Sequence, residues 1–215
     1  MFRHTMGEAT LQAKEEQVLL FWMRLKETDM PSEKEWQTYF SPRKTLASLG
    51  LKNGMVAADL GCGYGTFSIG AARIVGKTGK VYAIDIDPRM LRIVSKRARE
   101  KHLKNVIPIL ADLSAGKKGE RKTDDAVDFV LLANIIHGTK YKVRLLKAAA
   151  EILKPGGVVA VLNWNVEKTP RGPPMRMRST KEETVEWLSR AGYVSPAVVD
   201  VPPYHYAVVG RLPKR

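Results

Sequence analysis

The amino-acid sequence predicts an α/β protein whose core is a doubly wound, mostly parallel sheet of seven strands. Five apolar, β-rich runs recur along the chain, and helical stretches separate most of them. The first three runs start 25 residues apart, which is the spacing of βα units that build a parallel sheet. Two further runs predict an antiparallel strand at the C-terminus. The seven runs are residues 56–60, 81–84, 106–110, 127–132, 158–163, 197–201 and 206–209.

Length and composition fit one domain preceded by a short extension. The chain has 215 residues, of which 44% are hydrophobic and 27% are charged, as in soluble globular proteins. No apolar run approaches the roughly 20 residues that span a membrane, and the polar first ten residues do not resemble a signal peptide. We therefore expect a cytoplasmic protein with no membrane partner. Its helical extension over residues 1–44, apolar at 11–25, is expected to pack on the edge of a main domain over 45–215.

Capping signals predict where three helices begin or end. Asp87, followed by a proline, is placed to cap the helix after the second run. A helix over residues 144–153 is expected to stop at the Lys-Pro-Gly-Gly sequence that follows it. Ser179, with Glu182 three residues later, predicts a capping box that opens a helix ending at Gly192.

A glycine-rich turn follows the first apolar run and predicts a ligand site. Gly61, Gly63 and Gly65 carry no Cβ and can adopt positive φ, so the backbone can turn sharply against a ligand. Asp59 lies where open α/β sheets bind their ligands, at the carboxyl end of a strand. The dinucleotide fingerprint would need glycine where Thr66 stands, and the Asp59 carboxylate would repel a pyrophosphate. The turn therefore favours a cationic nucleoside that carries no phosphate.

This turn, which reads DLGCGYG, resembles the first motif of the class I S-adenosylmethionine (SAM) methyltransferases. The resemblance extends over residues 45–192 and implies a Rossmann-like fold with SAM as the cofactor. It implies that Asp85 in VYAIDID accepts hydrogen bonds from both ribose hydroxyls, with Asp87 as the rival acid. It also implies that Asp112 in ILADL receives the adenine amino group while the Leu113 backbone contacts a ring nitrogen. The expected SAM site comprises Asp59, Gly61, Cys62, Gly63, Gly65, Asp85, Ile86, Asp112, Leu113 and Asn134, and no metal ion is expected.

Candidate catalytic residues follow the fourth run, which reads DFVLLANIIHG. The resemblance places Asn134 and Ile135 beside the methyl group and the acceptor. His137 has two open interpretations, as a base or acceptor contact and as a helix-start residue satisfied by local backbone. In-line methyl transfer mainly requires alignment, so a dedicated base is optional, and Tyr204 and His205 are further candidates.

The sequence favours a small organic acceptor. The strand-end sequence ANII lacks the Asn/Asp-Pro-Pro-aromatic signature of enzymes that methylate nucleobase amino groups. The only cysteine, Cys62, lies in the glycine turn, where it fits as a small residue and cannot serve as the nucleophile of an acceptor pocket. The LKPGG sequence resembles quinone and sterol methyltransferases. A loop expected to wall the acceptor pocket contains Trp164, Arg171, Met175, Arg176 and Met177.

Strong positive charge leaves other functions open. The formal net charge is +14, and residues 89–122 carry eleven Lys and Arg against three acids, a net +8. This pattern fits an acidic partner, with RNA as the first candidate, but also a solvated helix face or a heat-adapted surface. The alternatives are an RNA or protein methyltransferase that uses this face, a SAM-binding module without activity, and an NAD-linked oxidoreductase, which Thr66 disfavours.

Overall fold

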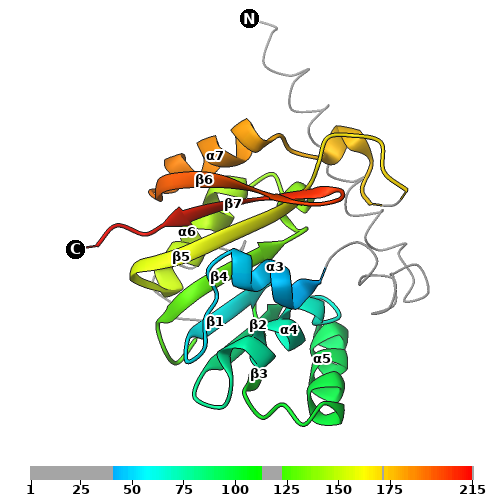
Figure 1. The fold of residues 1–215 in the computed structure, drawn as a ribbon, viewed down its shortest axis with the longest axis vertical. Coiled ribbons are helices and arrows are strands. Elements are labelled where there is room, and N and C mark those ends of the chain that lie inside the picture. Colours follow the sequence, from blue (N-terminus) through cyan, green and yellow to red (C-terminus); the bar gives the residue numbers. More distant parts are fainter. Residues whose placement is uncertain (1–40, 113–122, 171, 215) are drawn as a thin grey trace, which may run out of the picture.

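The computed structural model describes residues 41–112, 123–170 and 172–214 (Figure 1). Residues 1–40, which hold nearly all of the expected helical extension, lie outside these ranges. Within them, no helix is long and apolar enough to cross a membrane. The elements in chain order are α3 (Pro42–Ser48), β1 (Val56–Leu60), α4 (Thr66–Val75), β2 (Lys80–Asp85), α5 (Pro88–Glu100), β3 (Val106–Leu110), β4 (Val127–Ala133), η2 (Ile136–Gly138), α6 (Lys142–Ile152), β5 (Leu153–Trp164), η3 (Met175–Met177), α7 (Lys181–Arg190), β6 (Val194–Val201) and β7 (His205–Arg211).

These seven strands form one sheet in the order β3-β2-β1-β4-β5-β7-β6. Strand β1 pairs in parallel with both β2 and β4, so that Asp59 lies opposite Ala83 and Leu131. Strand β7 is antiparallel to its neighbours β5 and β6. The predicted doubly wound sheet with a C-terminal antiparallel strand is therefore confirmed. The winding reverses at β1, and open sheets bind ligands outside the carboxyl ends of the strands at such a reversal.

Helices cover both faces of the sheet, because alternate residues of its central strands point to opposite sides. Ala57 of β1 shares a core with Leu46 of α3 and Phe67 of α4. Leu60 of β1 belongs to the other core, with Leu146 of α6. Figure 1 shows α3 and α4 in front of the sheet and α6 behind it. Asp59 points to the α4 face, as Ala57 does, and its carboxylate is therefore covered by that helix.

The capping residue predicted for α5 is confirmed, but the one predicted for α7 is wrong by one position. Asp87 accepts a hydrogen bond from the backbone N–H of α5 at 2.8 Å. The capping box of α7 uses Thr180 and Glu183, whose reciprocal bonds measure 3.1 and 2.8 Å. Consecutive Ser-Thr and Glu-Glu pairs allow two registers. Tertiary contact selects between them, because Ser179 is buried and its carbonyl accepts a hydrogen bond from Tyr206 at 2.7 Å.

Helix α6 begins at residue 142 and β5 at residue 153, both earlier than the sequence predicts. Leu153 pairs with Val127, and the register then shifts so that Val158 pairs with Phe129. The Pro-Gly-Gly segment thus lies inside a strand irregularity, with Gly156 at φ 77°. Proline and paired glycines indicate a turn in a sequence, but they are also accepted at irregularities of a strand.

Candidate functional site

The glycine turn between β1 and α4 has the backbone geometry that its sequence predicts. Gly61, Gly63 and Gly65 have φ of 69°, 50° and 75°. A Cβ on Gly61 would lie 2.7 Å from Ile135, and one on Gly65 would lie 2.7 Å from Val94, so these two glycines permit close packing. A Cβ on Gly63 would meet no atom of the described residues within 4 Å. Gly63 is thus the member of the turn that presents its backbone to open space.

The Asp85 carboxylate joins the carboxyl end of β2 to the glycine turn. Its Oδ2 accepts a hydrogen bond from Gly63 N at 2.8 Å, and its Oδ1 accepts one from Asp87 N at 2.9 Å. Each carboxylate oxygen can accept more than one hydrogen bond, so the group retains capacity for a ligand. Ile86 follows directly and is 65% exposed, which is unusual for a large apolar side chain at a strand end. The Asp87 carboxylate already caps the start of α5. Asp85 is therefore the better candidate of the two for the acid that binds a ligand.

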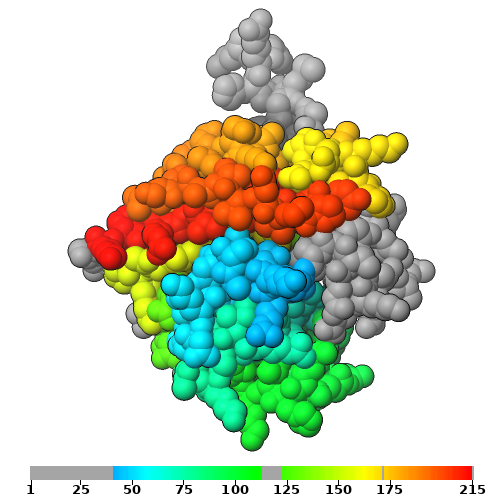
Figure 2. Space-filling view, viewed as in Figure 1, coloured from blue at the N-terminus to red at the C-terminus, as the bar shows by residue number. Residues whose placement is uncertain are grey.

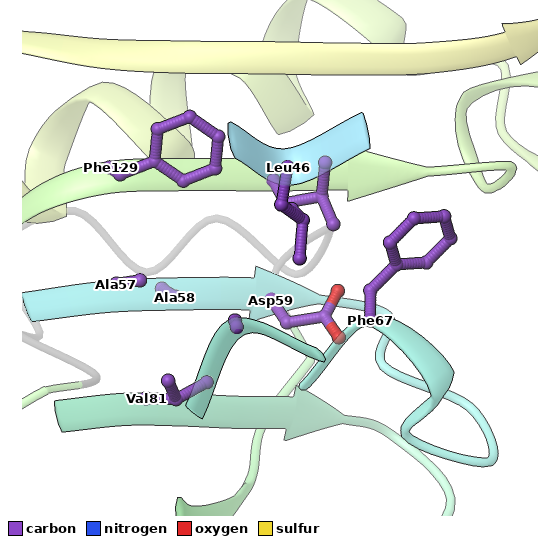
Figure 3. Close-up of a pocket in the computed structure, with 9 residues that line it drawn as sticks. Leu46, Ala57, Ala58, Asp59, Phe67, Val81 and Phe129 are labelled. Carbon is purple, nitrogen blue, oxygen red and sulfur yellow. The ribbon is translucent and has the colours of Figure 1, made fainter. Parts of the chain in front are cut away.

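Asp59 is buried beneath the turn, with 3% of its surface exposed. Ser68 of α4 donates a hydrogen bond to its Oδ2 at 2.6 Å. The pKa of Asp59 is raised to about 6, chiefly by burial and also by the negative charge of Asp85, against the opposing effect of the Ser68 hydrogen bond. Figure 3 shows the carboxylate beside Phe67 among otherwise apolar side chains. The cavity that these residues line has a volume of about 10 Å³, the size of a single water. The Asp59 carboxyl is therefore mostly ionised at neutral pH and becomes protonated as the pH falls below about 6.

The Cys62 side chain packs in the turn, as expected of a small residue. It is 7% exposed and belongs to a cluster with Ala83, Leu91 and Val94, and so contacts the inner face of α5. Burial raises the pKa of its thiol well above the ordinary range, and the carboxylates of Asp59 and Asp85 raise it further. A thiol in these surroundings stays protonated and is a poor nucleophile.

Asn134 and His137 lie where β4 ends, next to the glycine turn. Asn134 has φ 57°, a left-handed conformation that asparagine tolerates better than most residues. Its side-chain Oδ1 is buried and accepts no hydrogen bond from the described part of the chain. His137 of η2 is 7% exposed, and burial together with the charges of Lys142 and Arg178 lowers the pKa of its imidazole to about 4. His137 is therefore neutral at physiological pH.

The structure brings most of the predicted SAM residues to one edge of the sheet, but not all of them can be placed. Asp112 is exposed two residues after β3, and Ala111 between them donates a hydrogen bond to the Asp85 carbonyl at 3.1 Å. Leu113 lies outside the described residues, as does Arg171 of the acceptor loop. No group of His, Cys, Asp and Glu suited to a metal ion occurs in the described ranges.

The loop after β5 packs against the carboxyl end of that strand. Trp164 is 6% exposed, and its ring lies 4.0 Å from that of His205, its antiparallel partner on β7. Asn165 N donates to Tyr204 O at 2.8 Å and ties the loop to the β6–β7 turn. His205 is 1% exposed, and its pKa is lowered to about 3 by burial and by the charge of Arg178. Both buried histidines at this edge are consequently neutral.

Comparison with known proteins gives this geometry a family. A methyltransferase domain family matches residues 51–193. The crystal structure of a SAM-dependent methyltransferase from Aquifex aeolicus aligns with a TM-score of 0.76 and 28% identity, covering 92% of this chain and 98% of that one. This chain belongs to the SAM-dependent methyltransferase family.

Curated relatives of this chain include methyltransferases named for quinones. The ubiquinone/menaquinone biosynthesis C-methyltransferase UbiE of Laribacter hongkongensis is 30% identical over 137 residues, which are 64% of this chain and 54% of the relative. The 2-phytyl-1,4-naphtoquinone methyltransferase of Nostoc punctiforme is 28% identical over 120 residues, 56% of this chain and 51% of the relative. The chain thus spans about half the length of these relatives.

The sequence does not reveal two groups of polar contacts near the candidate site. Arg178 donates four hydrogen bonds to described residues of the loop after β5, whereas the sequence points to Arg171 and Arg176 there. The Tyr206 hydroxyl joins β7 to the start of α7 through the Ser179 and Thr180 carbonyls, at 2.7 and 2.8 Å. A tyrosine in an apolar strand run gives no signal of such a role. An arginine at the end of a Pro/Gly-rich loop predicts only weakly that its guanidinium donates hydrogen bonds to the backbone carbonyls of that loop.

Proposed function

We propose that this protein transfers the methyl group of SAM to a small, planar organic acceptor. The observation that carries the proposal is the junction of Gly63 and Asp85, where an open backbone position lies beside a carboxylate at the reversal of the sheet. A nucleoside with vicinal hydroxyls fits this junction, because a carboxylate can accept two hydrogen bonds side by side. A pyrophosphate does not fit, because Asp59 and Asp85 both place negative charge at the turn.

Each part of SAM has a matching group along this edge. Asp85 would accept the ribose hydroxyls, Ile86 would cover the adenine ring, and Asp112 would receive its amino group. The unsatisfied Oδ1 of Asn134 and the buried carboxylate of Asp59 are suited to the ammonium and sulfonium end. When bound, SAM supplies a methyl group on a positively charged sulfur. The protein's own task is to orient the acceptor in line with that methyl and to exclude water.

His137 is the group best placed to take a proton from the acceptor. It follows Asn134 by three residues after the end of β4, and its neutral imidazole can accept a proton, although a pKa of about 4 makes it a weak base. His205 is also neutral, but its buried ring packs against Trp164 at a tilt of 42°, which makes it a packing group. We therefore assign the optional base to His137 and a wall position to His205.

A quinol-like ring is the acceptor class that we propose. The curated relatives are named for quinone substrates, and the chain aligns with them over 137 and 120 residues. The strand-end sequence ANII and the inert Cys62 both argue against nucleobase chemistry. Trp164, which the structure places at the end of β5 and not in the loop, adds an aromatic wall that suits a planar ring.

Calorimetry with S-adenosylhomocysteine (SAH) tests the cofactor assignment. We expect wild-type protein to bind SAH and not NAD, and Asp85→Asn to weaken SAH binding at least tenfold. Asp200→Asn is the matched control, because Asp200 is exposed on β6, where it pairs with Lys181 at 2.6 Å. NAD binding without SAH binding, or equal effects of the two substitutions, would overturn the assignment.

An RNA or protein acceptor is the second candidate, and the exposed side of α5 favours it. Arg89, Arg92, Lys96 and Arg99 are exposed there, while residues 113–122 of the basic run lie outside the described ranges. Phosphate contacts of this kind make binding steeply salt dependent. A gel-shift titration with mixed RNA at 50 and 200 mM salt tests it, and methyl label that appears in RNA would place this candidate first.

A further inference from the structure

Arg178 is the centre of the loop that follows β5. Its Nε donates to the Pro173 carbonyl at 2.8 Å, and its Nη1 donates to the Asn165 and Glu167 carbonyls at 2.9 and 2.8 Å. Its Nη2 donates to the Thr169 hydroxyl at 2.7 Å. One guanidinium thus bridges positions that are 5 to 13 residues away in the chain. Only a planar fork with several fixed donors can satisfy such a set, and lysine cannot replace it.

The same guanidinium lies over a pair of rings at the carboxyl end of the sheet. Its Cζ is 5.4 Å from the centre of the Trp164 ring, a cation–π distance, and the His205 ring packs against the same indole with a centroid distance of 4.0 Å and a tilt of 42°. Gly172 completes the enclosure, since a Cβ at that position would lie 2.9 Å from the indole. The loop is therefore fitted to the Trp164 ring on more than one side. In the space-filling view the loop lies at the surface next to the β6–β7 hairpin (Figure 2).

Arg178 also lies within electrostatic range of both buried histidines at the carboxyl end of the sheet. Its charge lowers the pKa of His137, which follows β4, and of His205, which begins β7. In the described part of the chain, Arg178 is the one charged side chain that lowers the pKa of both histidines. The guanidinium of Arg178 thus interacts with the loop, with the candidate base His137 and with the Trp164–His205 ring pair.

We propose that Arg178 is the positioning residue of the acceptor wall. Its guanidinium holds residues 165–170 and 172–178 against the Trp164–His205 ring pair, and the held loop determines how a planar acceptor lies relative to His137. This inference rests on the proposed function, because it assigns the loop to the acceptor of that reaction. It adds Arg178 as a residue that acts by holding the acceptor wall in place and does not contact the reacting atoms.

The test uses full-length protein with Arg178→Met, Arg178→Lys and the control Arg190→Met, whose arginine is exposed on α7 and pairs with Glu186 at 3.3 Å. The acceptor probe is a short-chain demethylmenaquinol kept reduced. We expect Arg178→Met to raise the KM for this probe at least about tenfold, change kcat less than threefold and leave the SAH dissociation constant within twofold. Arg178→Lys should stay close to Arg178→Met, because a single nitrogen cannot bridge the carbonyls. A wild-type KM in either variant, or SAH affinity that falls together with KM, would overturn the proposal.

Hydrogen exchange separates a failure of this proposal from a failure of the proposed function. We expect Arg178→Met to accelerate amide exchange in residues 165–177 while β1 and α4 keep their protection. This measurement needs no substrate. If wild-type protein methylates no acceptor, the proposed function fails. If the loop amides in Arg178→Met exchange as in wild type, the positioning role fails whatever the acceptor.

Discussion

Replacing Gly63 with alanine separates ligand binding from folding at the glycine turn. The new methyl group would point into space that no described atom occupies within 4 Å. In our account a SAM molecule lies against this backbone position. The substitution should therefore damage binding far more than stability. Gly54→Ala is the matched control. Gly54 also has a positive φ, of 79°, and a Cβ there would lie 3.8 Å from its nearest neighbour, Thr78 Oγ1. Gly54 lies outside the candidate site.

The expected magnitudes follow from the backbone and from the methyl volume. A left-handed conformation costs a residue with a Cβ about 1–2 kcal/mol, which lowers the melting temperature by roughly 2–8 °C for a chain of this size. Both alanine variants should show this loss. An extra methyl group in a fitted contact costs about 1–3 kcal/mol, which corresponds to a roughly 5- to 150-fold weaker SAH complex. Only Gly63→Ala should show that second effect.

Thermal unfolding and SAH calorimetry on the two variants measure these quantities. A Gly63→Ala protein that binds SAH within twofold of wild type would refute the placement of SAM against the turn. So would a Gly54→Ala protein with equally weakened binding, since the effect would then come from general loosening of the domain.

Three further predictions concern buried polar groups. Asp59→Asn should raise the free energy of unfolding near pH 7 by up to roughly 3 kcal/mol. The reason is that the pKa of Asp59 is raised from 3.8 to about 6, so the folded state loses stability as the pH rises through this range. Urea unfolding at pH 4 and pH 7 should show the gain only at pH 7. The pKa of His205 is lowered to about 3, so the fold loses stability as the pH falls below 6.5. His205→Gln should therefore flatten the decline of the free energy of unfolding below pH 6.5 in urea unfolding. An unchanged slope would contradict the lowered pKa of His205. Tyr206→Phe should cost about 1–3 kcal/mol in the same assay, because the carbonyl of buried Ser179 loses its hydrogen bond, whereas Tyr141→Phe, at an exposed site, should be neutral.

The sequence predicts the sheet and the glycine turn well because both depend on local rules. Apolar runs at a 25-residue spacing determine βα units, and Gly61, Gly63 and Gly65 take the left-handed φ that only glycine adopts freely. The cap at Asp87 is equally local. The predicted SAM residues stay predictions, although Asp59, Asp85 and Asn134 do converge on one edge of the sheet.

Features that depend on tertiary contact could not be predicted from sequence. The register of the α7 capping box is selected by the burial of Ser179 against Tyr206, which no local pattern reveals. The Gly-Gly irregularity in β5 has the same composition as a turn and is distinguished only by its pairing with β4. The role of Arg178 arises from carbonyls that meet when the loop folds back on itself.

The measurement that tests the central claim most directly follows the methyl group itself. Protein incubated with methyl-labelled SAM and a fractionated cell extract, with and without a reduced short-chain demethylmenaquinol, is assayed for label in RNA, protein and small molecules. The account predicts label in the small-molecule pool, increased by the quinol and abolished by Asp85→Asn. Label confined to RNA or protein, or absent from every pool, would contradict it.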